Sequence, residues 1–366
     1  MLSLFKRHEP TKGEVTFKNR VQDFWNWYAE VAPRFYQTIE AKNCPSLATE
    51  VSAKVDEMLP GFAWVFGPGE NGNGHSFTLT GAGNPHRQLL AAFWRSQAPV
   101  LPGWTFYPAR QPGTIEGQKI QIQGMTFDPI EFWLVPEIDR ENKKIDLIVW
   151  HPLFAKMEEQ NRWTVLFLFL DEVLGEFGTQ QWVGEIKLND QRLAEAMPLQ
   201  ELQPYVKALE TETGWIKYPP GEIWTSYRFE KTHADFLRGD IFVGTTSHIP
   251  IVNDYVRSKG ELPNPLENTG ADFVFISFRA AFLPEGKQSE ARGRIEDALN
   301  QALRTESNGQ LLGGAYGHQN AYIDLLVIDG SNSLETVKEV LKEHNLPSGT
   351  SINYFAKERR GQRIEL

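Results

Sequence analysis

Two stretches of the chain repeat almost the same alternation of apolar and polar residues, I-D-L-I-V at residues 145–149 and I-D-L-L-V at residues 323–327. A period of two is typical of a β-strand that buries one of its faces. In His75–Thr80, Phe77 and Leu79 hold the matching apolar positions. The pattern predicts three strands of one kind, each with its large apolar side chains on a single face of a sheet.

Each of these strands stands in a similar succession: a first strand, a turn, the alternating strand, a helical apolar stripe and a last strand. The turn at residues 71–74 contains two Asn-Gly pairs, which tolerate the positive φ that a tight hairpin needs. The sequence thus predicts repeated ββαβ units. They span residues 62–108, 130–188 and 310–356, with helices at 86–97, 161–177 and 334–344. Descent from a duplication and chance recurrence of a common arrangement are both left open.

The last unit has a further strand and helix in front of it. Residues 273–280 read F-V-F-I-S-F-R-A, and Gln288–Thr305 carries Ile295, Leu299 and Leu303 at helical spacing. Together with the last unit these segments follow the order βαββαβ, which is that of a ferredoxin-like fold. We therefore expect an α+β protein with a ferredoxin-like C-terminal domain, whose antiparallel sheet is covered by helices on one face.

The first two units follow two expected helices, at residues 21–41, broken near Pro33, and at residues 46–59. These pieces predict an N-terminal α+β domain at residues 1–210. A Pro-Pro-Gly break then separates it from a C-terminal domain at residues 211–366. The C-terminal domain is expected to include two further strands, at residues 223–229 and 240–244.

Asp146 and Asp324 fall on the strand face opposite to the apolar stripe, and Thr78 holds the matching position in the first unit. An unpaired carboxylate is costly to bury. The simplest expectation is therefore a second face that is open to water or to the other domain. If helices covered that face as well, each aspartate would need a buried partner.

The composition narrows the classes of protein that remain. With 366 residues, 41% of them hydrophobic and 12% aromatic, the chain can build packed cores in more than one domain. Its net charge of −10 argues against a general nucleic-acid or anionic-membrane surface. Cys44 is the single cysteine, which excludes an intramolecular disulfide framework and a multi-cysteine metal site.

The start of the sequence, MLSLFKRHEPTKGEV, lacks an apolar stretch long enough for a signal peptide. No run approaches the roughly 18 apolar residues of a membrane span. The richest apolar run, at residues 163–170, is short and predicts a buried helix. We therefore expect a cytoplasmic protein.

No established catalytic or cofactor motif occurs in the chain. The histidines lack the zinc-protease spacings, and no phosphate-binding glycine loop is present, so we predict no metal and no cofactor. Five residues remain as weak catalytic candidates. His151 would pair with Asp171 or Glu172 as acid and base, and Arg279 and His318 would complete a site from the other domain. The structural alternative is that these residues mark a solvated helix edge and a polar turn.

Three apolar stretches also carry a resemblance: G-D-I-F-V-G at residues 239–244, F-V-F-I-S-F-R-A at 273–280 and A-Y-I-D-L-L-V-I at 321–328. With these, the region 239–355 resembles uncharacterised bacterial proteins that have a ferredoxin-like domain, of the kind found beside RNase E inhibitor B-like domains. The N-terminal stretches F-W-N-W-Y and L-P-G-F-A-W-V-F-G-P-G are also similar to bacterial sequences. The resemblance implies the fold and a regulatory or binding role, and it implies no active-site residues.

The repeated small α/β units, the acidic composition and the missing catalytic motifs favour a non-enzymatic module that binds or regulates another protein. The alternative is an enzyme that acts on a small molecule in a cleft between the two domains. RNA recognition is disfavoured because the strand at residues 321–328 lacks the aromatic and basic pattern that an RNA-binding sheet needs. The partner and the oligomeric state are left open.

Overall fold

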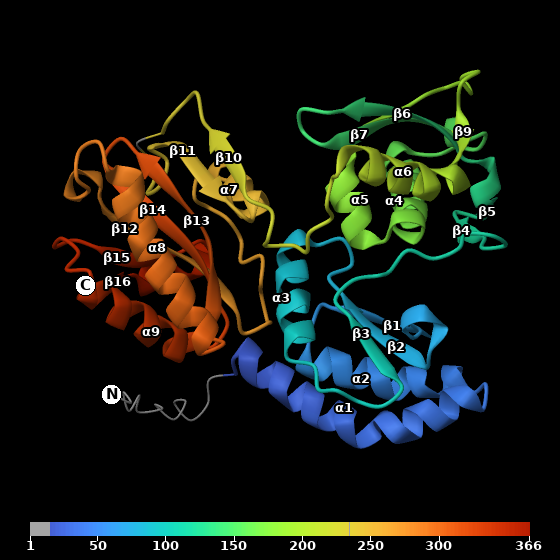
Figure 1. The fold of residues 1–366 in the computed structure, drawn as a ribbon, viewed down its shortest axis with the longest axis horizontal. Coiled ribbons are helices and arrows are strands. Elements are labelled where there is room, and N and C mark those ends of the chain that lie inside the picture. The colour runs from blue at the N-terminus through green and yellow to red at the C-terminus, as the bar shows by residue number, and fades with distance from the viewer. Residues whose placement is uncertain (1–14, 234) are drawn as a thin grey trace.

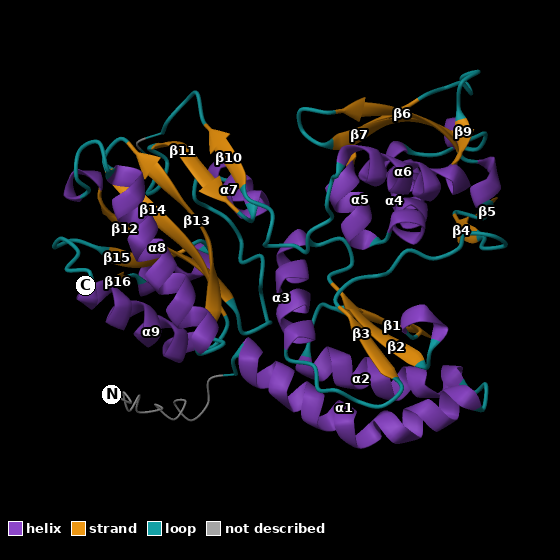
Figure 2. Ribbon diagram, viewed as in Figure 1, coloured by secondary structure: helices purple, strands orange, loops and turns teal. Residues whose placement is uncertain are grey.

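The computed structural model describes residues 15–233 and 235–366, and there the chain combines helices with mostly antiparallel sheets (Figure 1, Figure 2). It is an α+β protein. The described helices are α1 (Phe17–Glu40), α2 (Ala48–Met58), α3 (Pro85–Ser96), α4 (Glu159–Leu174), α5 (Glu176–Trp182), α6 (Leu202–Thr213), α7 (Ile249–Arg257), α8 (Gln288–Thr305) and α9 (Gly330–Glu343). Residues 1–14, which the sequence analysis considered for a signal peptide, lie outside the described ranges.

The strands of the described residues form four sheets. The first has the order β1-β2-β3, with β1 (Ala63–Pro68), β2 (His75–Thr80) and β3 (Trp104–Tyr107). β4 (Ile120–Ile122) and β5 (Met125–Phe127) form a hairpin. The third has the order β8-β7-β6-β9, with β6 (Trp133–Asp139), β7 (Lys144–Trp150), β8 (Val183–Leu188) and β9 (Met197–Pro198). The fourth has the order β10-β11-β13-β14-β12-β15-β16, with β10 (Thr225–Arg228), β11 (Ile241–Thr246), β12 (Asp272–Arg279), β13 (Gly309–Gly317), β14 (Asn320–Val327), β15 (Ser351–Tyr354) and β16 (Ile364–Glu365).

The seven-stranded sheet has both faces covered. On one face Ile323, Leu325 and Val327 share a cluster with apolar residues of α8 and α9, which confirms the predicted direction of this stripe. On the other face Tyr322 and Leu326 join a cluster with residues of α1, α3 and α7. The expectation that helices cover one face only, with the second face open to water, is therefore wrong for this sheet. The helices α1 and α3 on the second face come from residues 1–210, so the burial agrees with the alternative of a face turned to the other domain.

The four-stranded sheet follows the expectation more closely. Ile145, Leu147 and Val149 are buried in a cluster with residues of α4 and α6, while Asp146 on the opposite face is only partly buried. The helix expected at residues 161–177 is wrong in its extent. Gly175 takes φ +73°, which ends α4 at Leu174 and starts α5 at Glu176.

The three-stranded sheet lies against α1 (Figure 1). α1 continues through Pro33, so the break expected there is wrong. Buried aromatic residues on both sides of the proline, among them Tyr28 and Phe35, hold the helix against one core. Thr78 is also buried, although the sequence analysis placed its position on a solvated face.

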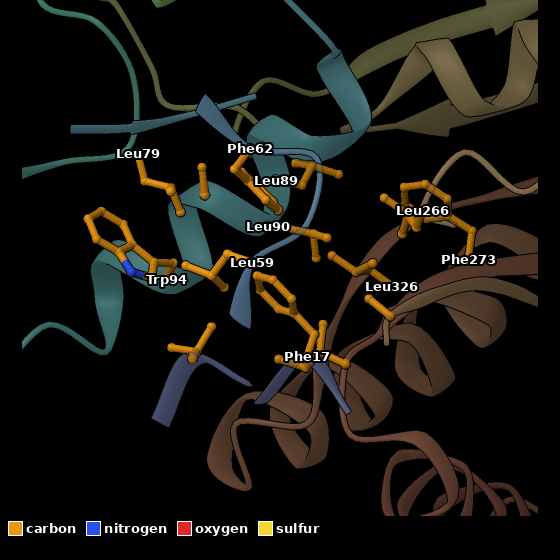
Figure 3. Packing of buried hydrophobic residues seen from close by; sticks show 14 of the residues in the cluster. Phe17, Leu59, Phe62, Leu79, Leu89, Leu90, Trp94, Leu266, Phe273 and Leu326 are labelled. Atoms are coloured by element: carbon orange, nitrogen blue, oxygen red, sulfur yellow. The ribbon is translucent and has the colours of Figure 1, made fainter. Parts of the chain in front are cut away.

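The buried apolar side chains of the described residues form three clusters, and one of them crosses the expected domain boundary at residue 210. In that cluster Phe17 of α1 and Leu90 of α3 lie beside Phe273 and Leu326 of the seven-stranded sheet (Figure 3). The second cluster holds the four-stranded sheet with α4 and α6, and the third lies under α8 and α9. The division into an N-terminal and a C-terminal domain stays a prediction.

Candidate functional site

His151, the first of the candidates predicted from the sequence, directly follows β7 and is buried. Its ring lies against Phe132, with the ring centroids 4.3 Å apart, and against Phe127 at 5.2 Å. The N–H of Leu153 donates to Nδ1 at 3.2 Å, which places the proton of the neutral imidazole on Nε2. Burial lowers the pKa of His151 to about 4, so the ring is uncharged near neutral pH.

Asp171 and Glu172 lie on α4 and have other partners. Gln118 Nε2 donates to Glu172 Oε1 at 3.0 Å. Burial raises the pKa of Asp171, and a hydrogen bond with Thr179 opposes that shift. Within the described residues no hydrogen bond or ion pair joins either carboxylate to His151.

Arg279 ends β12 of the seven-stranded sheet, and His318 lies in the turn between β13 and β14. β7 is not part of that sheet (Figure 1). Arg279 Nη1 donates to Gln319 Oε1 at 3.4 Å. The His318 ring stacks on Phe242, with the centroids 5.1 Å apart. These two candidates are therefore neighbours of one turn, and the structure gives them no contact with His151.

A buried ion pair that the sequence analysis missed lies under the same sheet. Arg238, just before β11, donates through Nη2 to Asp324 Oδ2 at 2.5 Å, and both side chains are fully buried. The guanidinium lies 4.9 Å from the ring centroid of Phe355 and 5.4 Å from that of Phe275. This is the buried partner that a covered Asp324 requires. Because Arg238 stands in a loop without periodicity, no pattern in the sequence indicated it.

Asp240 fixes the turn between β13 and β14. Its Oδ1 accepts the hydroxyl hydrogen bond of Tyr322 at 2.5 Å, and its Oδ2 accepts the N–H of Gln319 at 2.9 Å and that of Asn320 at 3.3 Å. Burial and this hydrogen bond to Asp240 raise the pKa of Tyr322. A hollow of about 300 Å³ lies beside these residues. The Asp240 carboxylate already accepts hydrogen bonds from three protein donors, so it serves the turn rather than a ligand in the hollow.

β10 forms one edge of the seven-stranded sheet. It pairs with β11 in antiparallel register, and the N–H of Phe229 donates to the carbonyl of Phe242 at 3.0 Å. Alternate residues of an antiparallel strand direct their backbone groups to opposite sides. Counting back from Phe229, the N–H and C=O groups of Ser226 and Arg228 point away from β11, toward the open edge.

The segment before β10 concentrates exposed apolar side chains. Ile216 is 61% exposed, Tyr218 44%, Ile223 40% and Trp224 53%. These are four of the thirteen large hydrophobic side chains that are exposed in the described residues, within nine positions of the chain. We call residues 216–228 the edge surface, because the apolar segment leads directly into the edge strand.

The backbone of the edge surface is held in place. Gln181 of α5 donates to the carbonyl of Ile216 and accepts the N–H of Tyr218, each at 2.7 Å. Tyr227 turns its ring toward the core, and burial raises its pKa to about 12. Opposite it, a Cβ on Gly244 would lie 2.5 Å from the Tyr227 ring, so only glycine fits at this approach. Both ends of the edge surface are therefore anchored, by Gln181 and by pairing with β11, which lowers the entropy cost of binding.

Comparison with known proteins and a search of the described residues for metal-binding clusters and membrane-spanning helices give no further candidate site. No family model, curated protein or solved structure matches the chain. Across residues 15–233 and 235–366, no cluster of three or more His, Cys, Asp or Glu side chains could hold a metal ion. Of the helices in these ranges, none has the length and apolar character needed to cross a membrane.

Proposed function

We propose that the chain is a non-enzymatic module that binds an extended segment of another protein by strand addition at the edge surface. The observation that carries this proposal is the direction of the backbone groups of Ser226 and Arg228, which point outward from an edge strand. An uncovered edge strand accepts a further strand through main-chain hydrogen bonds. A partner that adds as a β-strand satisfies these groups.

The flanking side chains restrict the partner. Ile223 and Trp224 are exposed directly before β10, so they favour a partner segment with an apolar residue at that end. Exposed tryptophan is a common anchor in protein interfaces because it buries a large area with few rotatable bonds. The proposed partner is therefore an extended segment with apolar side chains beside the paired stretch.

In this proposal the C-terminal part is ferredoxin-like, and the module is a cytoplasmic regulatory protein. Four strands of the seven-stranded sheet stand in the spatial order β13-β14-β12-β15. α8 joins β12 to β13, and α9 joins β14 to β15. This βαββαβ connection supports a ferredoxin-like core. β10, β11 and α7 then extend that core and create the new edge.

The test uses proline at an outward-facing position. Peptides selected from a random library against the full chain are measured for affinity to the unmodified protein and to Ser226→Pro. Proline removes the outward N–H and leaves the bonds between β10 and β11, so an edge strand tolerates it there. Loss of that bond is expected to weaken the selected peptides by roughly tenfold or more.

Ser226→Ala is the matched control, because it removes the hydroxyl and keeps the N–H. It should bind the peptides with unchanged affinity. Hydrogen exchange provides an independent readout, since the amides of Ser226 and Arg228 should become protected when a peptide is bound. Peptides that bind Ser226→Pro as tightly as the unmodified protein, without protecting these amides, would show that the edge surface is not the binding site.

A further inference from the structure

A cavity of about 190 Å³ lies where β7 and β8 end, separate from the edge surface. The two strands run parallel, with Val149 opposite Leu188, so both of their carboxyl ends meet at this cavity. In sheets with parallel strands, ligands bind in the crevice beyond the carboxyl ends. The residues that line the cavity there include Trp150, His151, Asn189 and Asp190, which directly follow or end the strands.

The large apolar side chains in the cavity lining are Trp150, Phe154 and Leu188. Trp150 also stands directly opposite Trp133 on β6, on the sheet face that α4, α5 and α6 do not cover (Figure 1). Neither tryptophan belongs to the three apolar clusters of the described residues. The Trp150 side chain is half-buried and lies outside these clusters, so part of its surface faces the cavity.

The cavity lining also includes a cation that hydrogen bonds hold in place. Arg162 donates through Nε and Nη2 to the carbonyl of Met157, at 2.9 and 2.7 Å. Within the described residues its Nη1 has no hydrogen-bond partner. His151 contributes an uncharged ring to the same wall, and Asp190 is exposed. A guanidinium held by two hydrogen bonds retains free N–H groups for a carboxylate or similar anion.

We infer that this cavity binds a small organic monoanion with one flat apolar ring, the ring against Trp150 and the anionic group at Arg162. A volume of about 190 Å³ equals that of roughly six water molecules, which suits a single-ring acid. Asp190 limits the charge of the ligand, because its carboxylate repels a second negative group. This inference does not depend on strand addition at β10.

The experiment compares benzoate with benzamide, which has nearly the same shape and no charge. Each is titrated into the full chain while the indole N–H resonance of Trp150 is followed by NMR, the resonance being assigned with Trp150→Phe. Benzoate should shift this resonance in a saturable way and bind at least tenfold more tightly than benzamide. Equal affinities for the two compounds, or no saturable shift of the Trp150 resonance, would overturn the inference.

Two variants test the charges from opposite directions. Arg162→Gln should weaken benzoate at least tenfold and leave benzamide unchanged, with thermal unfolding as the check that the variant is folded. Asp190→Asn removes a repulsive charge and should tighten benzoate several-fold, a gain that misfolding cannot produce. If Asp190→Asn leaves benzoate affinity unchanged or weakens it, the anion does not lie between these side chains. Ser226→Pro should bind benzoate as the unmodified chain does, which separates this site from the edge surface.

Discussion

The four-stranded and seven-stranded sheets contain nearly the same strand, and they treat its aspartate in opposite ways. Asp146 on β7 is partly exposed and accepts the N–H of Glu185 at 2.6 Å. Asp324 on β14 is fully buried and pairs with Arg238. The alternating pattern decides which face of the strand each aspartate occupies. What covers that face is decided by segments far away in the chain, and the surroundings of the two carboxylates differ for that reason.

The largest expected effect comes from removing the charge of Asp324, the buried one of the two aspartates. Asp324→Asn leaves the Arg238 charge buried without its partner, which costs about 3–5 kcal/mol of unfolding free energy. Replacing both residues, Arg238→Met with Asp324→Leu, removes the charges together and should restore most of that loss. Denaturant unfolding measures all three proteins. If the single substitution costs less than about 1 kcal/mol, the ion pair is not what allows this face to be buried.

The second effect is the pH dependence of stability, which follows from buried histidines. They lie beside both the seven-stranded and the four-stranded sheet. His86 Nδ1 lies 2.8 Å from His248 Nε2, and His86 Nε2 lies 3.2 Å from Asp254 Oδ2, where α3 meets α7. Burial, with the neighbouring His86, lowers the pKa of His248 to about 3, and burial lowers that of His86. Among the described residues of the four-stranded region, His151 is the only histidine with a lowered pKa, and burial lowers it to about 4.

The sign of the pH dependence follows from these shifts. A histidine whose folded pKa is lowered stabilises the fold fully above its unfolded pKa of about 6.5, and this stability is lost as the pH falls. The unfolding free energy should therefore decrease from pH 6.5 toward pH 4. His248→Gln retains an amide donor near the position of Nε2 and removes one titrating ring, so the unfolding free energy of this variant should decrease less steeply with falling pH. His151→Phe removes another titrating ring and should reduce the same slope independently. Identical pH slopes in all three proteins would contradict this account.

Particular elements show what the sequence could predict. The bounds of Gln288–Thr305 agree to the residue, and the strand predicted at residues 145–149 lies within Lys144–Trp150, because period and end signals are local there. α1 continues through Pro33, although a local rule predicts a break, because packing on both sides outweighs the missing N–H. α7 was not predicted at all. Its short sequence begins Ile-Pro-Ile, and its helical state depends on packing against the seven-stranded sheet.

The candidate sites also combine features that the local sequence predicts with features that depend on distant segments. The sequence predicted a strand at residues 223–229, and the structure contains β10 within that range. That β10 is an edge depends on which strands pair, and pairing across the sheet is not written in the local pattern. His151 was selected from the sequence for a pairing with Asp171 or Glu172, whereas the structure places it in the wall of the cavity at the end of β7. Arg162, which supplies the charge there, carries no signal of its own in a helical stretch.

The smallest expected effect tests the exposed side of the comparison. Asp146 Oδ1 lies over Gly184, where a Cβ would come within about 2.2 Å of it, and it accepts a single backbone hydrogen bond from Glu185. Because that carboxylate is partly in water, Asp146→Ala should cost only about 0.5–1.5 kcal/mol, the net value of one such bond. Asp146→Asn keeps an acceptor oxygen and should cost less, so the pair of variants separates the hydrogen bond from the charge. Measured beside Asp324→Asn by the same denaturant unfolding, it should have the smaller effect. If Asp146→Asn costs as much as Asp324→Asn, the negative charge matters equally on both sheets, and the contrast between a solvated and a buried face fails as the explanation.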